Sequence, residues 1–156
     1  SGASSTKSMY ALDNLWDGIG ALIVKFKAKY LFGKASIYSH FGDDAFAIIR
    51  HFLNLYFADS RNLVYAKNPI KTDVSEEIKS LFCGDNYKDD YVVLKRELKK
   101  LDRHIPPLVN SYMNVSPTMI AFDSTINEEF GNVYETGLLV TTADMYEEKV
   151  KRHMEF

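Results

Sequence analysis

The chain has 156 residues, the usual length of a single domain. Apolar residues make up 46% of it and aromatic residues 13%, so it can bury a packed core, and global disorder is excluded. A formal net charge of −2 argues against a general nucleic-acid binder. The single cysteine, Cys83, excludes an internal disulfide and fits a reducing compartment.

The first 26 residues predict a loop and a helix. Residues 1–8 are small and polar, which is typical of a loop that ends in a helix N-cap, and the helix is expected over 9–26. Gly18 and Gly20 each cost about 1 kcal/mol relative to alanine inside a helix, so we expect a close approach to a sheet there. The predicted buried face consists of Leu12, Leu15, Trp16, Ile19, Leu22 and Ile23.

A strand and a second helix follow. Residues 30–38 predict a strand. Asp43 and Asp44 suit the positive N-terminus of a helix that we expect to end near Ala58. Residues 63–66 predict a short strand. The buried stripe of the second helix consists of Phe46, Ile49, Phe52, Leu53 and Tyr56.

The second half of the chain begins with a polar connector over 67–86, which contains a short helix over 75–82. A long helix is expected over 87–103, with Tyr91, Leu94, Leu98 and Leu101 inward. Pro106 and Pro107 interrupt it, because the residue before a proline avoids helical geometry. The remaining expected elements are a short helix over 107–115, strands over 118–123 and 132–141 joined through 128–131, and a helical tail.

These elements predict the α/β (α+β) class, with a mixed sheet flanked by helices. We expect a single domain over 1–143 and a charged tail over 144–156. So small a sheet leaves an open edge, which proteins cover or pair. Either a preceding part of the protein supplies strands, or two copies pair as a homodimer.

Four motifs, in order, carry a resemblance to a known family. They are Leu15-Trp16-Asp17-Gly18-Ile19-Gly20, Tyr30-Leu31-Phe32-Gly33-Lys34-Ala35-Ser36, Ile105-Pro106-Pro107-Leu108 with Tyr112, and Ile126-Asn127-Glu128-Glu129-Phe130-Gly131. The ordered set covers most of the chain and resembles the haemolysin-like branch of the GNAT acyltransferases, closest to Bacteroidetes-type members. That branch includes enzymes that attach fatty acyl groups to ornithine or glycine.

The resemblance implies a GNAT-like fold and an N-acyltransferase of lipid biosynthesis. The donor would be the phosphopantetheine of acyl carrier protein, or acyl-CoA, with no tightly bound cofactor, and the acceptor would be an amino acid amine. Family members carry a preceding half with several strands, so the chain is expected to be a C-terminal portion that is incomplete as an enzyme. A cytoplasmic protein, peripheral on the inner membrane, is expected because the product would be a lipid.

The resemblance also implies a donor site. Ser5, Thr6, Lys7 and Ser8 would precede a helix whose free N–H groups attract phosphate, and in the family this turn faces the pantetheine arm. A plain N-cap explains the same residues. Ser36 is a further donor-binding candidate, at the end of the strand where ligands of open α/β sheets gather.

Three residues are candidates for proton transfer during amide formation. Tyr38 and His40 follow the first predicted strand, and a histidine has an unperturbed pKa near 6.5, which suits a base. The alternative for His40 is a solvent-facing loop residue. Tyr56 lies where many GNAT enzymes place a proton-donating tyrosine, but its position on the apolar stripe favours core packing.

Other charged residues allow weaker hypotheses. The basic residues Arg96, Lys99, Lys100 and Arg103 share a helix face that could dock acyl carrier protein or anionic lipid, or simply be solvated. Asp123, Glu128 and Glu129 could receive the acceptor's amine, or serve as turn and edge residues. The histidines lack metal-ligand spacing, so no metal site is expected. The competing hypothesis for the whole chain is a non-catalytic interaction or membrane-surface domain.

Overall fold

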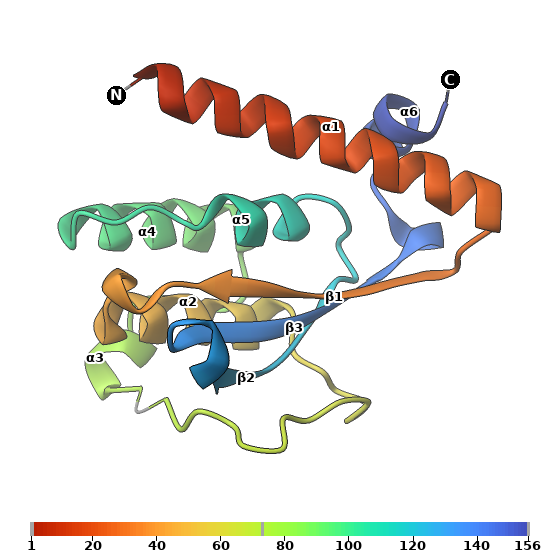
Figure 1. Cartoon of the computed structure of the whole chain (residues 1–156). Coiled ribbons are helices and arrows are strands. Elements are labelled where there is room, and N and C mark those ends of the chain that lie inside the picture. The colour runs from red at the N-terminus through yellow and green to blue at the C-terminus, as the bar shows by residue number, and fades with distance from the viewer. Residues whose placement is uncertain (1, 73, 156) are drawn as a thin grey trace. The chain divides into compact units, whose positions relative to one another are not determined.

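A computed structural model describes residues 2–72 and 74–155, and for residues 2–9 it describes the backbone alone (Figure 1). The α-helices within this range are α1 (Gly2–Phe26), α2 (Asp43–Tyr56), α3 (Glu76–Lys79), α4 (Tyr87–Lys100), α5 (Pro107–Met113) and α6 (Glu147–Met154). The strands are β1 (Tyr30–Ile37), β2 (Ile120–Asn127) and β3 (Val133–Thr141). The predicted class, a sheet flanked by helices, is confirmed.

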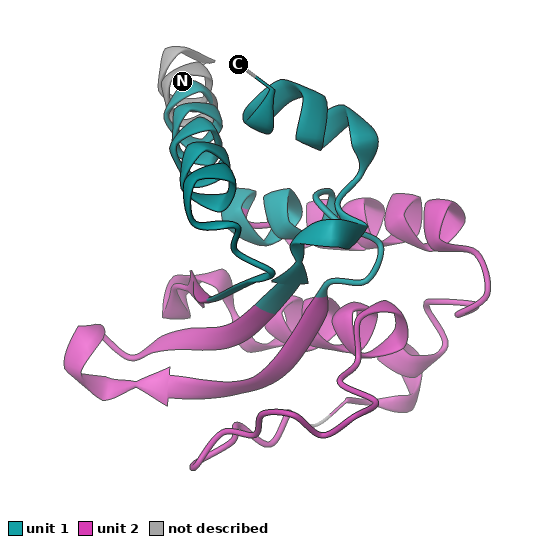
Figure 2. Cartoon of the chain, turned by 90° about the vertical axis from the view of Figure 1, so that its right-hand side faces the viewer, with its two compact units in different colours: residues 1–32, 107–119, 139–156 teal, residues 33–106, 120–138 magenta. Residues whose placement is uncertain are grey.

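The chain divides into two compact units, coloured separately in Figure 2. Unit 1 contains residues 1–32, 107–119 and 139–156, and unit 2 contains residues 33–106 and 120–138. Both β1 and β3 begin in one unit and end in the other. The expected tail over 144–156 belongs to unit 1, where it forms α6.

Unit 1 is built on the long helix α1, which packs against α6. The indole N–H of Trp16 donates to the Ser111 hydroxyl at 2.5 Å, and the Trp16 ring meets the Tyr112 ring edge-on at 5.4 Å. His153 on α6 is buried and lies 2.6 Å from the Asp17 carboxylate. Three of the residues in the family-like motifs therefore meet in one core.

Three expectations for α1 are wrong. The helix begins at Gly2, so residues 2–8 are not a loop before it. The close approach at Gly20 is to α6 and not to a sheet, because a side chain at Gly20 would collide with the backbone carbonyl of His153. The buried face is also narrower than predicted: Leu15 and Leu22 are exposed, while Trp16 and Ile23 are buried.

Unit 2 contains most of the three-stranded antiparallel sheet, whose strand order is β1-β3-β2. The β2–β3 hairpin turns through the expected residues 128–131. At its end, Gly131 and Asn132 have left-handed φ angles of 70° and 55°. Lys34 on β1 pairs with Glu135 on β3 at 2.7 Å, and the buried hydroxyls of Ser124 and Thr136 bond across β2 and β3 at 2.6 Å.

Helix α2 packs against the sheet and against α4. Its predicted apolar stripe is buried, except that Tyr56 is half-buried. The ring centroids of Phe46 and of Tyr134 on β3 lie 4.4 Å apart. An aromatic cluster also joins α2 to α4. That cluster consists of Phe52, Tyr56, Phe82, Tyr87 and Tyr91.

The strand expected over 63–66 is absent from the described structure, and this prediction is wrong. Residues 59–72 form a long irregular loop between α2 and α3 (Figure 1). The loop runs along the outer edge of β2, where the N–H of Ala121 donates to Phe57 and the N–H of Ile70 donates to Ser124. The apolar residues that suggested a strand, Leu63, Val64 and Tyr65, are exposed on this loop.

Candidate functional site

Tyr38 and His40 lie together at the carboxyl end of β1. Tyr38 immediately precedes a 3₁₀ turn over Ser39–Phe41, and its ring stacks on the His40 ring with centroids 5.8 Å apart and planes 18° from parallel. Both side chains are exposed. A phenol and an imidazole are thus presented side by side where they can reach a ligand.

Arg103, which follows α4, fixes the turn that carries this pair. Its guanidinium donates to the carbonyl oxygen of Phe41 at 2.9 Å and to that of His40 at 3.0 Å. The turn then passes through Gly42, whose φ of 92° suits a residue without a side chain. Sequence reasoning placed Arg103 in a basic stripe and missed this role, because the two segments lie some 60 residues apart.

Tyr56 occupies a different place. It is the last residue of α2, whereas His40 precedes the start of that helix. The 14 residues of α2 span roughly 20 Å. Its hydroxyl donates to Asp90 at 2.6 Å, and burial together with this carboxylate raises the Tyr56 pKa well above its ordinary range. A phenol held this firmly in its protonated form serves packing better than proton transfer.

The proposed donor-binding residues are only partly visible. Ser5, Thr6, Lys7 and Ser8 lie in α1 by backbone, and their side chains fall outside the described residues. Because only the first four N–H groups of a helix are free, those of Thr6, Lys7 and Ser8 are engaged within α1. Ser36 lies half-buried on β1, two residues before Tyr38.

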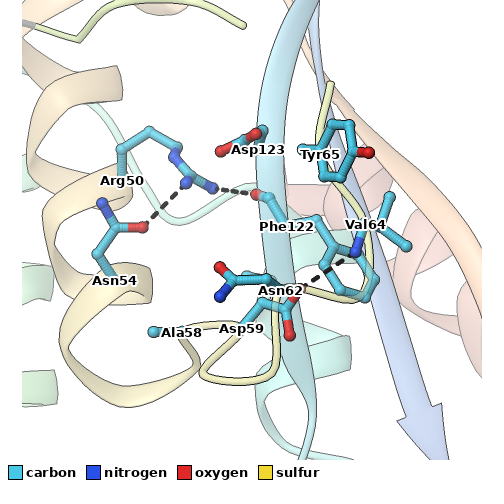
Figure 3. A pocket seen from close by; sticks show the side chains of 10 residues that line it. Arg50, Asn54, Ala58, Asp59, Asn62, Val64, Tyr65, Phe122 and Asp123 are labelled. Atoms are coloured by element: carbon cyan, nitrogen blue, oxygen red, sulfur yellow. Dashed lines mark hydrogen bonds between the residues drawn. The ribbon is translucent and has the colours of Figure 1, made fainter. Parts of the chain in front are cut away.

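A pocket of about 160 Å³ opens beside the C-terminal half of α2 (Figure 3). Arg50 lies at its base, 7% exposed, and donates to the Phe122 carbonyl and to the Asn54 side chain, both at 2.9 Å. Burial lowers the Arg50 pKa, and the nearby Asp123 carboxylate acts in the opposite direction. The 59–66 loop supplies the opposite wall through Asn62, Val64 and Tyr65.

The charge of this pocket limits what it can bind. The lining contains two carboxylates, Asp59 and Asp123, and one guanidinium, that of Arg50, so it carries a net negative charge and disfavours a phosphate group. Asp123 accepts the Ala66 N–H with one carboxylate oxygen at 3.2 Å. The other acidic candidates, Glu128 and Glu129, lie exposed in the hairpin turn.

The basic face of α4 is largely neutralised. Glu97 is buried and pairs with Arg96 at 2.9 Å and with Lys100 at 2.7 Å, and these bonds lower its pKa. Arg103 is occupied by the 38–42 turn. Of the four predicted basic residues, only Lys99 has no such partner among the described residues.

Cys83 is exposed. Hydrogen bonding with the carboxylates of Asp85 and Asp90 raises its pKa, which disfavours the thiolate that a nucleophile needs. In the described part of the chain, no three histidine, cysteine or acidic residues are placed to hold a metal ion. None of the described helices is long and apolar enough to cross a membrane.

Two acyltransferases are similar in sequence to this chain. The chain is 44% identical over 154 residues to a glycine N(alpha)-acyltransferase of Bacteroides thetaiotaomicron, an alignment covering 97% of this chain and 46% of that protein. It is 42% identical to the glycine N(alpha)-acyltransferase of Phocaeicola vulgatus, with coverages of 97% and 47%. The chain thus spans about half the length of the curated relatives it matches. No protein-family model and no solved structure matches it.

Proposed function

We propose that this chain is part of an N-acyltransferase that transfers a fatty acyl group to the amine of an amino acid. The observation that carries the proposal is the 42–44% identity to two named glycine N(alpha)-acyltransferases across nearly the whole chain. The GNAT-like, haemolysin-type assignment is part of the proposal and rests on the motif resemblance. Glycine is the acceptor that the relatives' names favour.

The reaction would be direct attack of the amine on a thioester. Its nitrogen forms a bond to the acyl carbon, the carbon–sulfur bond breaks, and the amine's proton passes to a base while the thiolate leaves and is protonated. We assign the proton transfer to His40 with Tyr38 beside it, since they form the exposed pair at the end of β1. Ser36 and residues 5–8 would contact the donor, acyl-CoA or the phosphopantetheine of acyl carrier protein.

The experiment is lipid extraction from cells that express this chain or a version extended to match the full length of its relatives. We expect new N-acyl amino-acid lipids from the extended version. His40→Ala should reduce their formation on the order of 100-fold, the loss expected for a general base, and Tyr38→Phe by less. Lipids from this chain alone would place every catalytic residue within it.

Asp123→Asn is the matched control. It removes the carboxylate of Asp123 on β2, the one acidic candidate for receiving the amine that lines the pocket, while the new amide oxygen can still accept the Ala66 N–H. A loss with Asp123→Asn and none with His40→Ala would move the site to the pocket. A folded extended protein that yields no lipid would instead favour the alternative, a non-catalytic interaction domain.

The open surface of unit 1 suggests where the remainder of such an enzyme would pack. In the strand order β1-β3-β2, β1 lies at an edge of the sheet. Exposed apolar side chains continue from α1 into β1, namely Tyr10, Leu15, Leu22, Val24, Phe26, Tyr30 and Phe32. We propose that further strands of the longer protein cover this surface, and that the isolated chain pairs with a second copy.

A further inference from the structure

We propose that the pocket formed by α2, β2 and the 59–66 loop binds a small zwitterionic amino acid, with its carboxylate at Arg50 and its ammonium group at Asp123. All residues that line this pocket belong to unit 2. The pocket lies beside the C-terminal half of α2, whereas Tyr38 and His40 precede the start of that helix. The site is therefore separate from the proton-transfer pair, and the proposal goes beyond the proposed function without depending on it.

The pocket presents two opposite charges that are not joined in an ion pair. The guanidinium of Arg50 on α2 and the carboxylate of Asp123 on β2 point toward one another (Figure 3). Burial lowers the pKa of Arg50 and the Asp123 carboxylate opposes this effect, so the two charges interact. No ion pair among the described residues joins them. A ligand with one charge of each sign can bind both groups, whereas a simple anion or cation meets one group of its own sign.

Arg50 is fixed in position and still has donors for a ligand. Its side chain is 7% exposed, and its two terminal nitrogens each donate one hydrogen bond, to the Phe122 carbonyl oxygen and to the Asn54 side chain, both at 2.9 Å. A guanidinium has five N–H donors, and within the described structure the remaining three make no hydrogen bond. A carboxylate is the group that such a fork of donors binds best.

Asp123 keeps one carboxylate oxygen for an ammonium group. Its Oδ2 accepts the N–H of Ala66 at 3.2 Å, and its Oδ1 accepts no hydrogen bond from any described residue. The other carboxylate of the lining, Asp59, is already used by three backbone N–H groups of its own loop. Arg50 and Asp123 are therefore the two charges that a ligand meets, and a zwitterion matches them.

The size of the pocket limits the ligand. Its volume of about 160 Å³ is below the roughly 300–1,000 Å³ typical of sites for drug-sized molecules. The apolar part of the lining comes from the short side chains of Ala58, Val64 and Ala121, and a backbone bridge joins Ala58 to Ala121. An amino acid with a very short side chain, such as glycine or alanine, fits this space.

The test is isothermal titration calorimetry of the protein with glycine and alanine. Methylamine and acetate, which carry one charge each, are the comparison ligands. We expect saturable binding of the amino acids and binding of either comparison ligand that is weaker by about tenfold or more, because each lacks one charge-assisted contact. Methylamine or acetate that binds as tightly as glycine would overturn the proposal, as would the lack of saturable binding of both amino acids.

Asp123→Asn should weaken glycine binding about tenfold or more, since it removes the charge that faces the ammonium group while the new amide oxygen can still accept the loop N–H. Glu129→Gln is the matched control, because it makes the same change at an exposed residue of the hairpin turn, outside the pocket. Equal effects of the two substitutions would contradict the proposal. Arg50 is tested by the comparison ligands and not by substitution, because it also anchors Asn54 and the Phe122 carbonyl.

Backbone amide NMR shifts locate the bound amino acid. We expect glycine to shift the amides of residues 59–66 and 121–123 and to leave those of residues 38–42 unchanged. Shifts confined to residues 38–42 would place the amino acid beside Tyr38 and His40 and overturn the proposal of a separate site. Acyl transfer is measured apart from this, by lipid extraction. New lipids without glycine binding in the pocket would overturn this proposal alone, and binding without new lipids would count against the proposed function alone.

Discussion

At the residue scale, the carboxylate of Asp90 is held by four hydrogen bonds. Asp90 is 2% exposed and accepts hydrogen bonds from the Tyr56 hydroxyl, the N–H groups of Cys83 and Gly84, and the Cys83 thiol. Burial acts to raise its pKa, but these donors outweigh burial and hold the pKa below its usual value. Asp90 therefore fixes the turn after α3 to the end of α2.

Asp90→Asn should lower the free energy of unfolding by about 2 kcal/mol at neutral pH, because an amide accepts fewer of these bonds and adds donors with no acceptors. Since the folded-state pKa is depressed, the carboxylate's contribution is complete above its unfolded pKa of about 4 and fades as the pH falls through the folded pKa. Urea unfolding from pH 7 to pH 3 measures both effects. Asp89→Asn, on the exposed face of α4, is the control, and equal losses in the two variants would contradict this account.

Sequence patterns predicted some residues and not others at this scale. The stripe that contains Tyr56 follows from helical spacing, so its packing role was predictable. Tyr56 and its partner Asp90 are 34 residues apart in the chain, and Arg103 is 63 residues from His40, whose carbonyl it binds. Periodicity reports only which face of an element is apolar, and hence gives no register between distant elements.

At the element scale, Gly20 allows α1 to approach the backbone of α6 closely. Gly20→Ala should destabilise the chain by about 1–3 kcal/mol, since the new methyl group would strike the carbonyl of His153 and push α6 away. Gly18→Ala is the matched control: nothing lies within 4 Å of its added carbon, so it should stabilise by up to about 1 kcal/mol through helix propensity. Thermal unfolding of the two variants checks this, and shifts of the same sign would refute the packing argument.

Most elements could be predicted from sequence to within a few residues. The wrong ones share a physical cause: the small polar residues at the start of α1 and the apolar run at 63–66 were assigned from local composition, which tertiary context overrides. The same limit explains Leu15 and Leu22, which are apolar at helical spacing yet exposed. Their spacing predicts an apolar face of α1 that is wider than the part of this helix buried within unit 1.

At the scale of the whole molecule, the position of β1 at the edge of the sheet leads to a prediction about association. We expect the isolated chain to elute as a dimer, at about twice its 17.8 kDa mass, in size-exclusion chromatography with light scattering. Phe32→Lys, on the exposed side of the edge strand, should return it to a monomer, whereas Val92→Lys on α4 should not. A monomer at every concentration tested would show that the edge is protected in some other way.

The two units are interleaved, because the chain passes from one to the other at residues 32–33, 106–107, 119–120 and 138–139. Neither unit is a continuous stretch of the gene, so no truncation can isolate one of them. A deletion that removes α6 takes away a wall of unit 1, and a premature stop before β3 leaves both units without a segment. Functional dissection of this region therefore depends on point substitutions.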